Sequence, residues 1–121
     1  MSRPILVVED SEDLLLLMKL TLESVGYKVE TATNGKEAIS SLFEVQPLLV
    51  LMDIMMPNTN GLEVSRSIKE DWANQNLPIL LVSAVDRLED KQLESSKADG
   101  ILYKPFNLDD LISRVEELVA S

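Results

Sequence analysis

Four short apolar stretches of the sequence each end at side chains that can bind a cation, accept a chemical group or donate a hydrogen bond. They are Ile5–Val8 before Glu9 and Asp10, Leu48–Met52 before Asp53, Leu77–Val82 before Ser83, and Gly100–Tyr103 before Lys104. Each of these residues alone has an ordinary interpretation as a helix cap, a turn former or a solvated charge. Because the pattern recurs at four strand-like ends, we favour a shared site.

The carboxylates of Glu9, Asp10 and Asp53 predict a metal site if the fold gathers them. Neighbouring carboxylates repel one another unless a cation joins them, and ligands that are all oxygen favour a hard divalent ion such as Mg²⁺. Mg²⁺ keeps several waters, which leaves room for a phosphoryl group among its ligands. The ammonium of Lys104 suits a further oxygen of such a group.

Composition narrows the possible chemistry. The 121 residues include 21 acidic and 11 basic side chains, for a net charge of -10. This charge repels nucleic acid and anionic membranes, so we expect no direct binding to either and favour a cationic partner. The absence of cysteine and histidine excludes disulfides, thiolate metal sites and imidazole bases. No apolar stretch reaches the ~20 residues of a membrane-spanning helix, and we expect one cytoplasmic domain over residues 1–121.

Hydrophobic periodicity predicts five strands that alternate with five helices. The remaining predicted strand is Tyr27–Ala32, and the predicted helices cover about Glu12–Val25, Lys36–Val45, Gly61–Trp72, Arg87–Lys97 and Leu108–Val119. This alternation indicates an α/β fold whose parallel sheet has helices on both faces. A flavodoxin-like, doubly wound order 2-1-3-4-5 is the usual one, although periodicity leaves the order open. That order would bring the four strand ends to one crevice.

Helical spacing also predicts which side chains face the core. The expected inward residues are Leu14, Leu17, Met18, Thr21 and Val25 in the first helix, Ala38, Ile39 and Leu42 in the second, and Leu62, Val64, Ile68 and Trp72 in the third. The first helix carries further leucines, Leu15, Leu16 and Leu20, outside its stripe. This surplus suits docking to another protein, and a dimer contact or burial under loops is the alternative.

The strand ends contain motifs that occur together in one protein family. The motifs are Glu9-Asp10, Asp53 within Met-Asp-Ile-Met-Met-Pro, Gly61, Ser83-Ala84 and Lys104-Pro105-Phe106. Over essentially the whole chain, the sequence resembles a receiver domain of the two-component response regulator family, of the stand-alone kind found in chemotaxis. No effector segment follows the last predicted helix, so we expect output through protein contacts.

The resemblance implies that Asp53 is the phospho-acceptor. A phosphohistidine of a partner histidine kinase or histidine phosphotransfer protein would donate the phosphoryl group, and phosphorylation would change the affinity for a downstream protein target. Lys104 and Ser83 would contact other phosphoryl oxygens. Such a protein catalyses only its own phosphorylation and dephosphorylation, so we expect no enzyme acting on a metabolite, and a monomer or weak dimer.

The resemblance also implies a Mg²⁺ site. Asp10, Asp53 and the backbone carbonyl of Met55 would hold the ion, with Glu9 acting through a water. A cis peptide bond before Pro105 is expected on the same ground.

The sequence departs from the family pattern at several positions. Glu9 stands where Asp is commoner, and Ile101 stands where the family usually places the aromatic residue that turns inward on activation. We therefore expect output to depend on loop and helix shifts through Ser83, or Ile101 to be a packed strand residue. Met55 and Val85 flank the expected line of water attack, and because both are apolar we expect slow self-dephosphorylation.

Two other functions use parts of the same residue set. A Mg²⁺-dependent phosphohydrolase would use Asp53 as a transient nucleophile, but it needs an acid or base where Met55 stands. A pseudo-receiver acting as a constitutive interaction module would be expected to lack Asp53 or Lys104, and both are present.

Overall fold

The computed structural model describes residues 3–84 and 88–120, which fold around a five-stranded parallel sheet. The sheet contains β1 (Ile5–Val8), β2 (Val29–Ala32), β3 (Leu49–Asp53), β6 (Ile79–Ser83) and β7 (Gly100–Tyr103). The helices are α1 (Glu12–Ser24), α2 (Gly35–Val45), α3 (Gly61–Glu70), α4 (Asp90–Ser96) and α5 (Leu108–Ala120). The strand order β2-β1-β3-β6-β7 confirms the predicted flavodoxin-like order.

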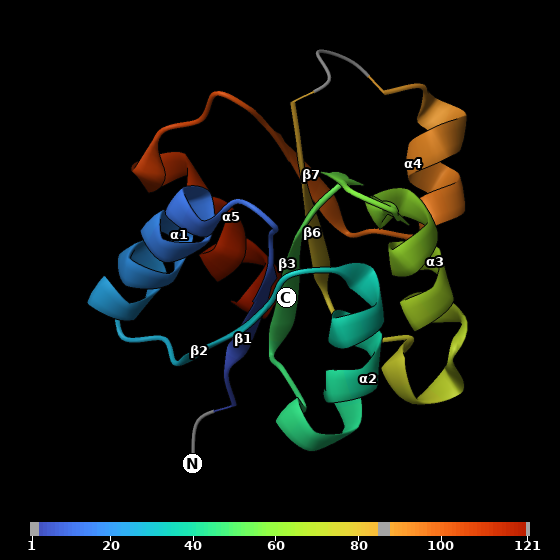
Figure 1. Ribbon diagram of the computed structural model, residues 1–121, viewed down its shortest axis with the longest axis horizontal. Coiled ribbons are helices and arrows are strands. Elements are labelled where there is room, and N and C mark those ends of the chain that lie inside the picture. Colours follow the sequence, from blue (N-terminus) through green and yellow to red (C-terminus); the bar gives the residue numbers. More distant parts are fainter. Residues whose placement is uncertain (1–2, 85–87, 121) are drawn as a thin grey trace.

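Helices cover both faces of the sheet (Figure 1). Successive strand residues point to opposite faces. Ile5 and Val7 accordingly pack with residues of α1 and α5, whereas Leu6 and Val8 pack with residues of α2 and α3. Every residue of β1, β3 and β6 is buried. Burial on both faces explains why these strands are continuous apolar runs rather than alternating ones.

Local side chains define where the helices begin. The Ser11 hydroxyl accepts a hydrogen bond from the Leu14 N–H at 3.4 Å, and the Asn34 side chain accepts one from the Glu37 N–H at 2.8 Å. These bonds satisfy backbone donors that the first turn leaves free. Gly26, with φ of 100°, reverses the chain after α1, as expected for a glycine past a helix end.

The core face of α1 differs from the prediction. Leu17 and Val25 are 46% and 47% exposed, and Leu22 is fully buried in their place. Leu15, which was placed outside the inward stripe, packs against the core. Leu16 and Leu20 are exposed as predicted. Because α1 has leucines on most of its circumference, periodicity could not select the face.

Two other predicted core residues are exposed. Ile39 in α2 is 44% exposed and Trp72 is 83% exposed. Trp72 lies in a separate 3-10 helix, η1 (Trp72–Asn74), because α3 ends at Glu70. The Asp71 backbone is extended there, and its side chain accepts a hydrogen bond from the Ala73 N–H at 3.0 Å, which begins η1 in a new direction.

Two further features differ from the prediction. A small antiparallel hairpin, β4 (Met55–Met56) and β5 (Thr59–Asn60), follows β3 and was not predicted. α4 begins at Asp90, later than predicted, and Arg87 lies outside the described residues. Leu88, just before α4, and Leu93 within it pack in the core.

Candidate functional site: an acidic pocket beside a lysine

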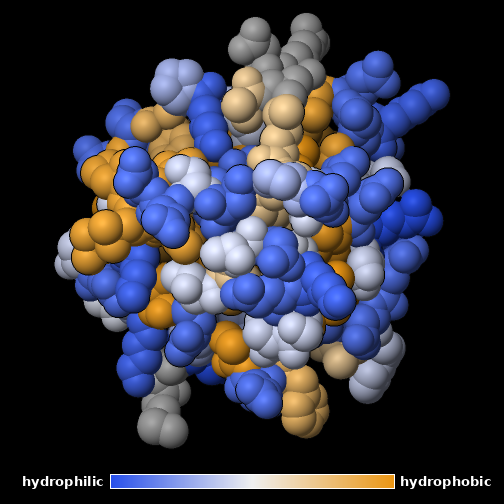
Figure 2. Space-filling model, viewed as in Figure 1, coloured by the Kyte–Doolittle hydropathy of each residue, from blue (hydrophilic) through white to orange (hydrophobic). Residues whose placement is uncertain are grey.

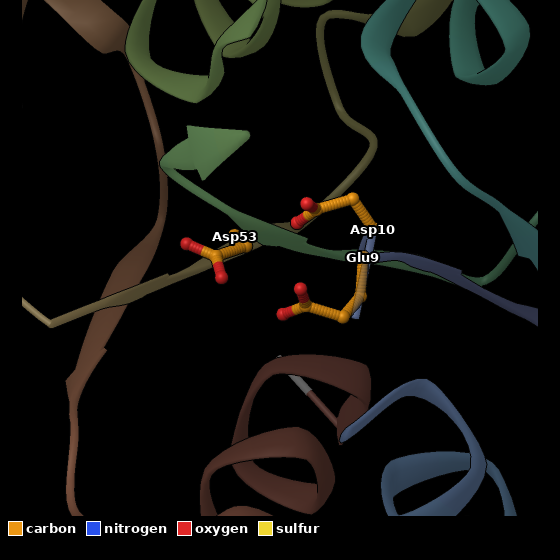
Figure 3. A group of neighbouring side chains, drawn as sticks. All are labelled: Glu9, Asp10 and Asp53. Carbon is orange, nitrogen blue, oxygen red and sulfur yellow. The ribbon is translucent and has the colours of Figure 1, made fainter. Parts of the chain in front are cut away.

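The acidic side chains meet at the carboxyl edge of the sheet, where β1 and β3 end side by side. Val8 is paired with Met52 in the sheet, so Glu9 and Asp53 are the next residues on neighbouring strands. Figure 3 shows the carboxylates of Glu9, Asp10 and Asp53 directed toward one another. One oxygen from each lies within 4.8 Å of the others. The predicted gathering of these three residues is confirmed.

The Asp53 carboxylate is held at both of its oxygens. Oδ1 accepts a hydrogen bond from the Met55 N–H at 2.9 Å, and Oδ2 lies 2.8 Å from the Lys104 Nζ. Asp53 is 3% exposed, so this ion pair is screened little by water. The contacts fix the direction in which the carboxylate oxygens point.

Lys104 reaches the pocket because β7 extends alongside β6. Ser83 is paired with Tyr103 in the sheet, and the Lys104 N–H donates to the Ser83 carbonyl at 2.8 Å. The peptide bond between Lys104 and Pro105 is cis, as predicted. The ammonium also lies 3.9 Å from Glu9 Oε1, so it serves two carboxylates at once.

Glu9 is the most buried acid of the pocket, with 1% of its surface exposed. Oε2 accepts a hydrogen bond from the Ser11 N–H at 3.0 Å, but within residues 3–84 and 88–120 the buried Oε1 has no hydrogen-bond partner. Burial, followed by the neighbouring Asp53, raises the pKa of Glu9 from 4.5 to about 8, although the Ser11 N–H and Lys104 oppose the shift.

These properties fit a hard divalent cation. A buried carboxylate oxygen without a hydrogen-bond partner normally requires an explanation, and an ion or its bound water would supply one. The donor set consists of oxygens only, which Mg²⁺ prefers. Asp10 is exposed, so an ion held between Glu9, Asp10 and Asp53 could exchange ligands with solvent.

The sequence also predicts roles for Ser83, Met55, Val85 and Ile101 in or near the site. Ser83 is fully buried at the end of β6, next to Ala84, and its contact with a phosphoryl group stays a prediction. The Met55 side chain is 60% exposed beside the acids, and the role of its carbonyl as a metal ligand stays a prediction. Val85 lies outside the described residues. Ile101 is half-buried and packs against the core, as its interpretation as a packed strand residue requires.

Gly61 has a positioning role that the sequence did not reveal. Its N–H donates to the Ile54 carbonyl at 2.8 Å, and an added Cβ would lie 2.6 Å from both the Asp53 carbonyl oxygen and the Ile54 Cα. The first residue of α3 therefore lies against the backbone of Asp53, and there is no room there for a side chain. The sequence marked Gly61 as one of the shared motif residues, after a turn-like Asn-Thr-Asn sequence, but gave no steric reason for it.

The fold and site together define a doubly wound α/β domain with a pocket of three acidic residues at the carboxyl edge of its sheet. The profile of the response regulator receiver domain matches residues 5–116. The chain therefore belongs to the response regulator receiver domain family.

A curated relative is the DNA-binding dual master transcriptional regulator RpaA of Synechocystis sp. It is 31% identical over 116 residues, which are 95% of this chain and 48% of the relative. The chain thus spans about half the length of this relative.

Solved structures agree with the family. The response regulator TrrA of Thermotoga maritima, in complex with Mg(2+)-BeF, is 36% identical with a TM-score of 0.86, covering 97% of this chain and 99% of its own. The chemotaxis response regulator CheY4 of Vibrio cholerae is 27% identical with a TM-score of 0.89, covering 98% and 99%. None of the helices in the described ranges is long and apolar enough to cross a membrane.

Proposed function

We propose that this receiver domain is a Mg²⁺-dependent phospho-acceptor. Asp53 would take a phosphoryl group from a phosphohistidine of a histidine kinase or histidine phosphotransfer protein. The observation that supports this most is the Asp53 carboxylate itself, buried, fixed at 2.8 Å from Lys104 and adjacent to two further acids. The Mg²⁺ in the solved complex of the relative TrrA supports the same cation here.

In the transfer, an Asp53 carboxylate oxygen attacks phosphorus in line with the bond to the donor nitrogen. The new P–O bond forms as the P–N bond breaks, and the histidine of the partner leaves as an imidazole that takes up a proton. The product is an acyl phosphate on Asp53. This chain has no histidine, so the phosphohistidine lies outside these 121 residues.

The residues of this chain orient the reaction and balance its charge. The Met55 N–H and the Lys104 ammonium hold the carboxylate before the donor arrives, so little freedom is lost on reaction. Lys104 also offsets the negative charge on a phosphoryl oxygen, and the Ser83 hydroxyl is proposed to bind another. Glu9, Asp10, Asp53 and the Met55 carbonyl would hold Mg²⁺, which neutralises the charge of the transferring oxygens when bound.

The exposed leucines of α1 are the proposed docking surface for the phosphodonor. Leu16, Leu17 and Leu20 are 55%, 46% and 54% exposed, and Figure 2 shows hydrophobic side chains gathered at the left edge, where α1 lies. α1 begins directly after the acidic pair, so a helix packed on it would stand close to Asp53. A phosphorylated domain would then change its affinity for a downstream protein, with no turnover of a metabolite.

Small-molecule phosphorylation tests the chemistry without the unidentified kinase. Phosphoramidate has the same kind of P–N bond as phosphohistidine, so with Mg²⁺ it should add one phosphoryl group that hydroxylamine removes, as expected for an acyl phosphate. A hydroxylamine-resistant product would indicate a phosphoester on a hydroxyl and contradict the proposal. The acyl phosphate should be long-lived, because the apolar Met55 side chain cannot orient water, and rapid loss of the group would contradict that part.

A further inference from the structure

Two aromatic side chains are almost fully exposed at the edge of the molecule opposite the acidic pocket. Phe43 near the end of α2 is 86% exposed, and Trp72 in η1, the one tryptophan of the chain, is 83% exposed. Aromatic side chains are normally among the most buried contributors to a core. Figure 2 shows hydrophobic atoms projecting at the lower edge of the molecule, where α2 ends in Figure 1.

A groove of about 660 Å³ lies between these two elements. Phe43 lines one wall, Asp71 and Ala73 on either side of Trp72 line the other, and the nearly buried Leu42 and Leu77 add apolar surface. We refer to this groove together with Phe43 and Trp72 as the aromatic groove. Its volume is in the range that accommodates a small ligand or several side chains of a peptide.

The aromatic groove lies at the amino edge of the sheet. Pro47 and Pro78, which precede β3 and β6, both line it. Asp53 ends β3 and the acidic pocket lies at the carboxyl edge, so the whole length of the sheet separates the two. An occupant of the aromatic groove therefore touches none of the residues that bind the phosphoryl group.

The charges around the aromatic groove favour a cationic occupant. Glu44 follows Phe43, Asp71 precedes Trp72, and both acids are exposed. In the part of the chain that the structure describes, neither forms an ion pair. Arg3 also lines the groove, but its guanidinium donates to the backbone carbonyls of Gln46 and Pro47, each at 2.8 Å. Asp71 also accepts the Ala73 N–H at 3.0 Å, so its second oxygen and the Glu44 carboxylate, which lies beside the groove lining, are left for an external partner.

We propose that the aromatic groove binds a segment of a protein partner that presents apolar anchors flanked by Lys or Arg. The anchors would cover Phe43 and fill the groove, while the cations would pair with Glu44 and Asp71 and stack on the aromatic faces. A second copy of this chain is a poorer occupant, because each copy carries a net charge of -10 and would set like charges against one another.

This surface is distinct from the phosphodonor surface on α1 and goes beyond the proposed function. Since the aromatic groove and Asp53 share no residue and lie at opposite edges of the sheet, we expect binding at the groove to be the same with and without a phosphoryl group on Asp53. The groove would then hold the receiver next to its partner whether or not Asp53 is phosphorylated.

Trp72 supplies a built-in reporter for the test. The probe is a helical peptide of about four turns made of Leu and Lys, with Leu at every third or fourth position and without tryptophan. At about 0.15 M salt, where long-range attraction is screened, it should shift the Trp72 emission to the blue in a saturable way. The same peptide with Ser for Leu should bind at least about tenfold more weakly.

Variants distinguish groove binding from general attraction to an acidic protein. Phe43→Ser keeps every charge and should weaken binding about tenfold or more, Glu44→Lys should weaken it several-fold, and Leu108→Ser, at an exposed leucine on α5, should leave it unchanged. Equal binding to Phe43→Ser, or no saturable shift, would overturn the proposal. Dimerisation in sedimentation that Phe43→Ser abolishes would overturn it in favour of a second copy.

Phosphorylation provides the last control. Peptide affinity should be the same before and after treatment with acetyl phosphate and Mg²⁺, and Phe43→Ser should be phosphorylated at the wild-type rate. A change in affinity on phosphorylation would refute the independence of the two edges. Because the peptide titration needs no phosphorylation, its failure is distinguishable from failure of the phospho-acceptor chemistry.

Discussion

At the scale of single residues, the buried part of the acidic pocket contains more negative than positive charge. Lys104 is one cation placed beside two buried carboxylates, 2.8 Å from Asp53 and 3.9 Å from Glu9. Burying charges is costly unless each is paired and hydrogen-bonded. Burial first, and then the neighbouring Asp53, raise the pKa of Glu9 to about 8, and a bound divalent ion would lower it again.

Glu9 therefore predicts a pH dependence for Mg²⁺ binding. Its pKa of about 8 means that the metal-free pocket holds a proton at neutral pH, which the ion must displace. Mg²⁺ affinity should rise with pH up to about 8 and then level off, by as much as about tenfold per pH unit. Calorimetry in buffers of different ionisation enthalpy should detect proton release at pH 7. In Glu9→Gln the affinity should lose most of this pH dependence, and an equally steep wild-type and variant profile would refute the assignment.

The raised pKa of Glu9 also determines whether the free energy of unfolding rises or falls with pH. The pKa of Glu9 is about 8 in the folded chain and about 4.5 in the unfolded chain, so the unfolded chain loses its proton first. Without Mg²⁺, the contribution of Glu9 to the unfolding free energy is complete below about pH 4.5 and is lost as the pH rises toward 8. Glu9→Gln should reduce that loss in urea denaturation. A wild-type decline no steeper than that of the variant would contradict the prediction.

Gly61 carries a steric prediction. A Cβ at this position would lie 2.6 Å from the Asp53 carbonyl oxygen, which is backbone and cannot move aside cheaply. Gly61→Ala should therefore destabilise the fold by about 1–3 kcal/mol in urea denaturation and slow phosphorylation by shifting Asp53. Ser67→Ala, at an exposed position of the same helix, is the control and should do neither. If Gly61→Ala had the stability and the phosphorylation rate of the original chain, the contact would be relieved without moving β3, and the prediction would be wrong.

At the scale of elements, the exposed leucines of α1 distinguish two routes of phosphorylation. Leu16→Glu should slow transfer from a phosphorylated histidine phosphotransfer protein at least about tenfold, because a charge replaces an apolar contact in the docked helix pair. Phosphorylation by acetyl phosphate, which needs no docking, should be unchanged, and so should the melting temperature. Equal slowing with both donors would indicate damage to the pocket, and no slowing with either would exclude docking there.

Elements differ in how well the sequence predicts them. β1, β3 and β6 were predictable because burial on both faces requires continuous apolar runs, and their order and ends then placed Glu9, Asp53 and Ser83 at one edge. The two-residue strands β4 and β5 are too short to show any period. The exposure of Trp72 depends on Asp71, which ends one helix and caps the next turn, and hydrophobicity carries no sign of that change in direction.

The sequence predicted which residues form the site but not the distances between their atoms. Parallel strands necessarily bring their carboxyl ends together, so the residue types sufficed to assemble the acids and Lys104. The Glu9 oxygen without a hydrogen-bond partner and the close approach of Gly61 depend on small differences in interatomic distance, which side-chain packing sets and sequence patterns do not encode. The aromatic groove was missed for a related reason, since Trp72 was expected to face the core and hydrophobicity alone does not show that Phe43 is exposed.

At the scale of the whole molecule, we have proposed one functional site at each edge of the sheet. Its carboxyl edge holds the acidic pocket, and its amino edge holds the aromatic groove. The net charge of -10 favours cationic surfaces on the phosphodonor and on the occupant of the aromatic groove. Both associations should therefore weaken as salt concentration rises. A cytoplasmic location stays a prediction.

The central claim is that Asp53 accepts a phosphoryl group with the help of a divalent ion. Intact mass spectrometry after treatment with acetyl phosphate tests it most directly, with and without Mg²⁺, on the chain and on Asp53→Ala. We predict a gain of one phosphoryl group that requires Mg²⁺ and is lost in the variant. No gain under any condition, or an equal gain in Asp53→Ala, would contradict the account and favour a receiver that acts only as a constitutive interaction module.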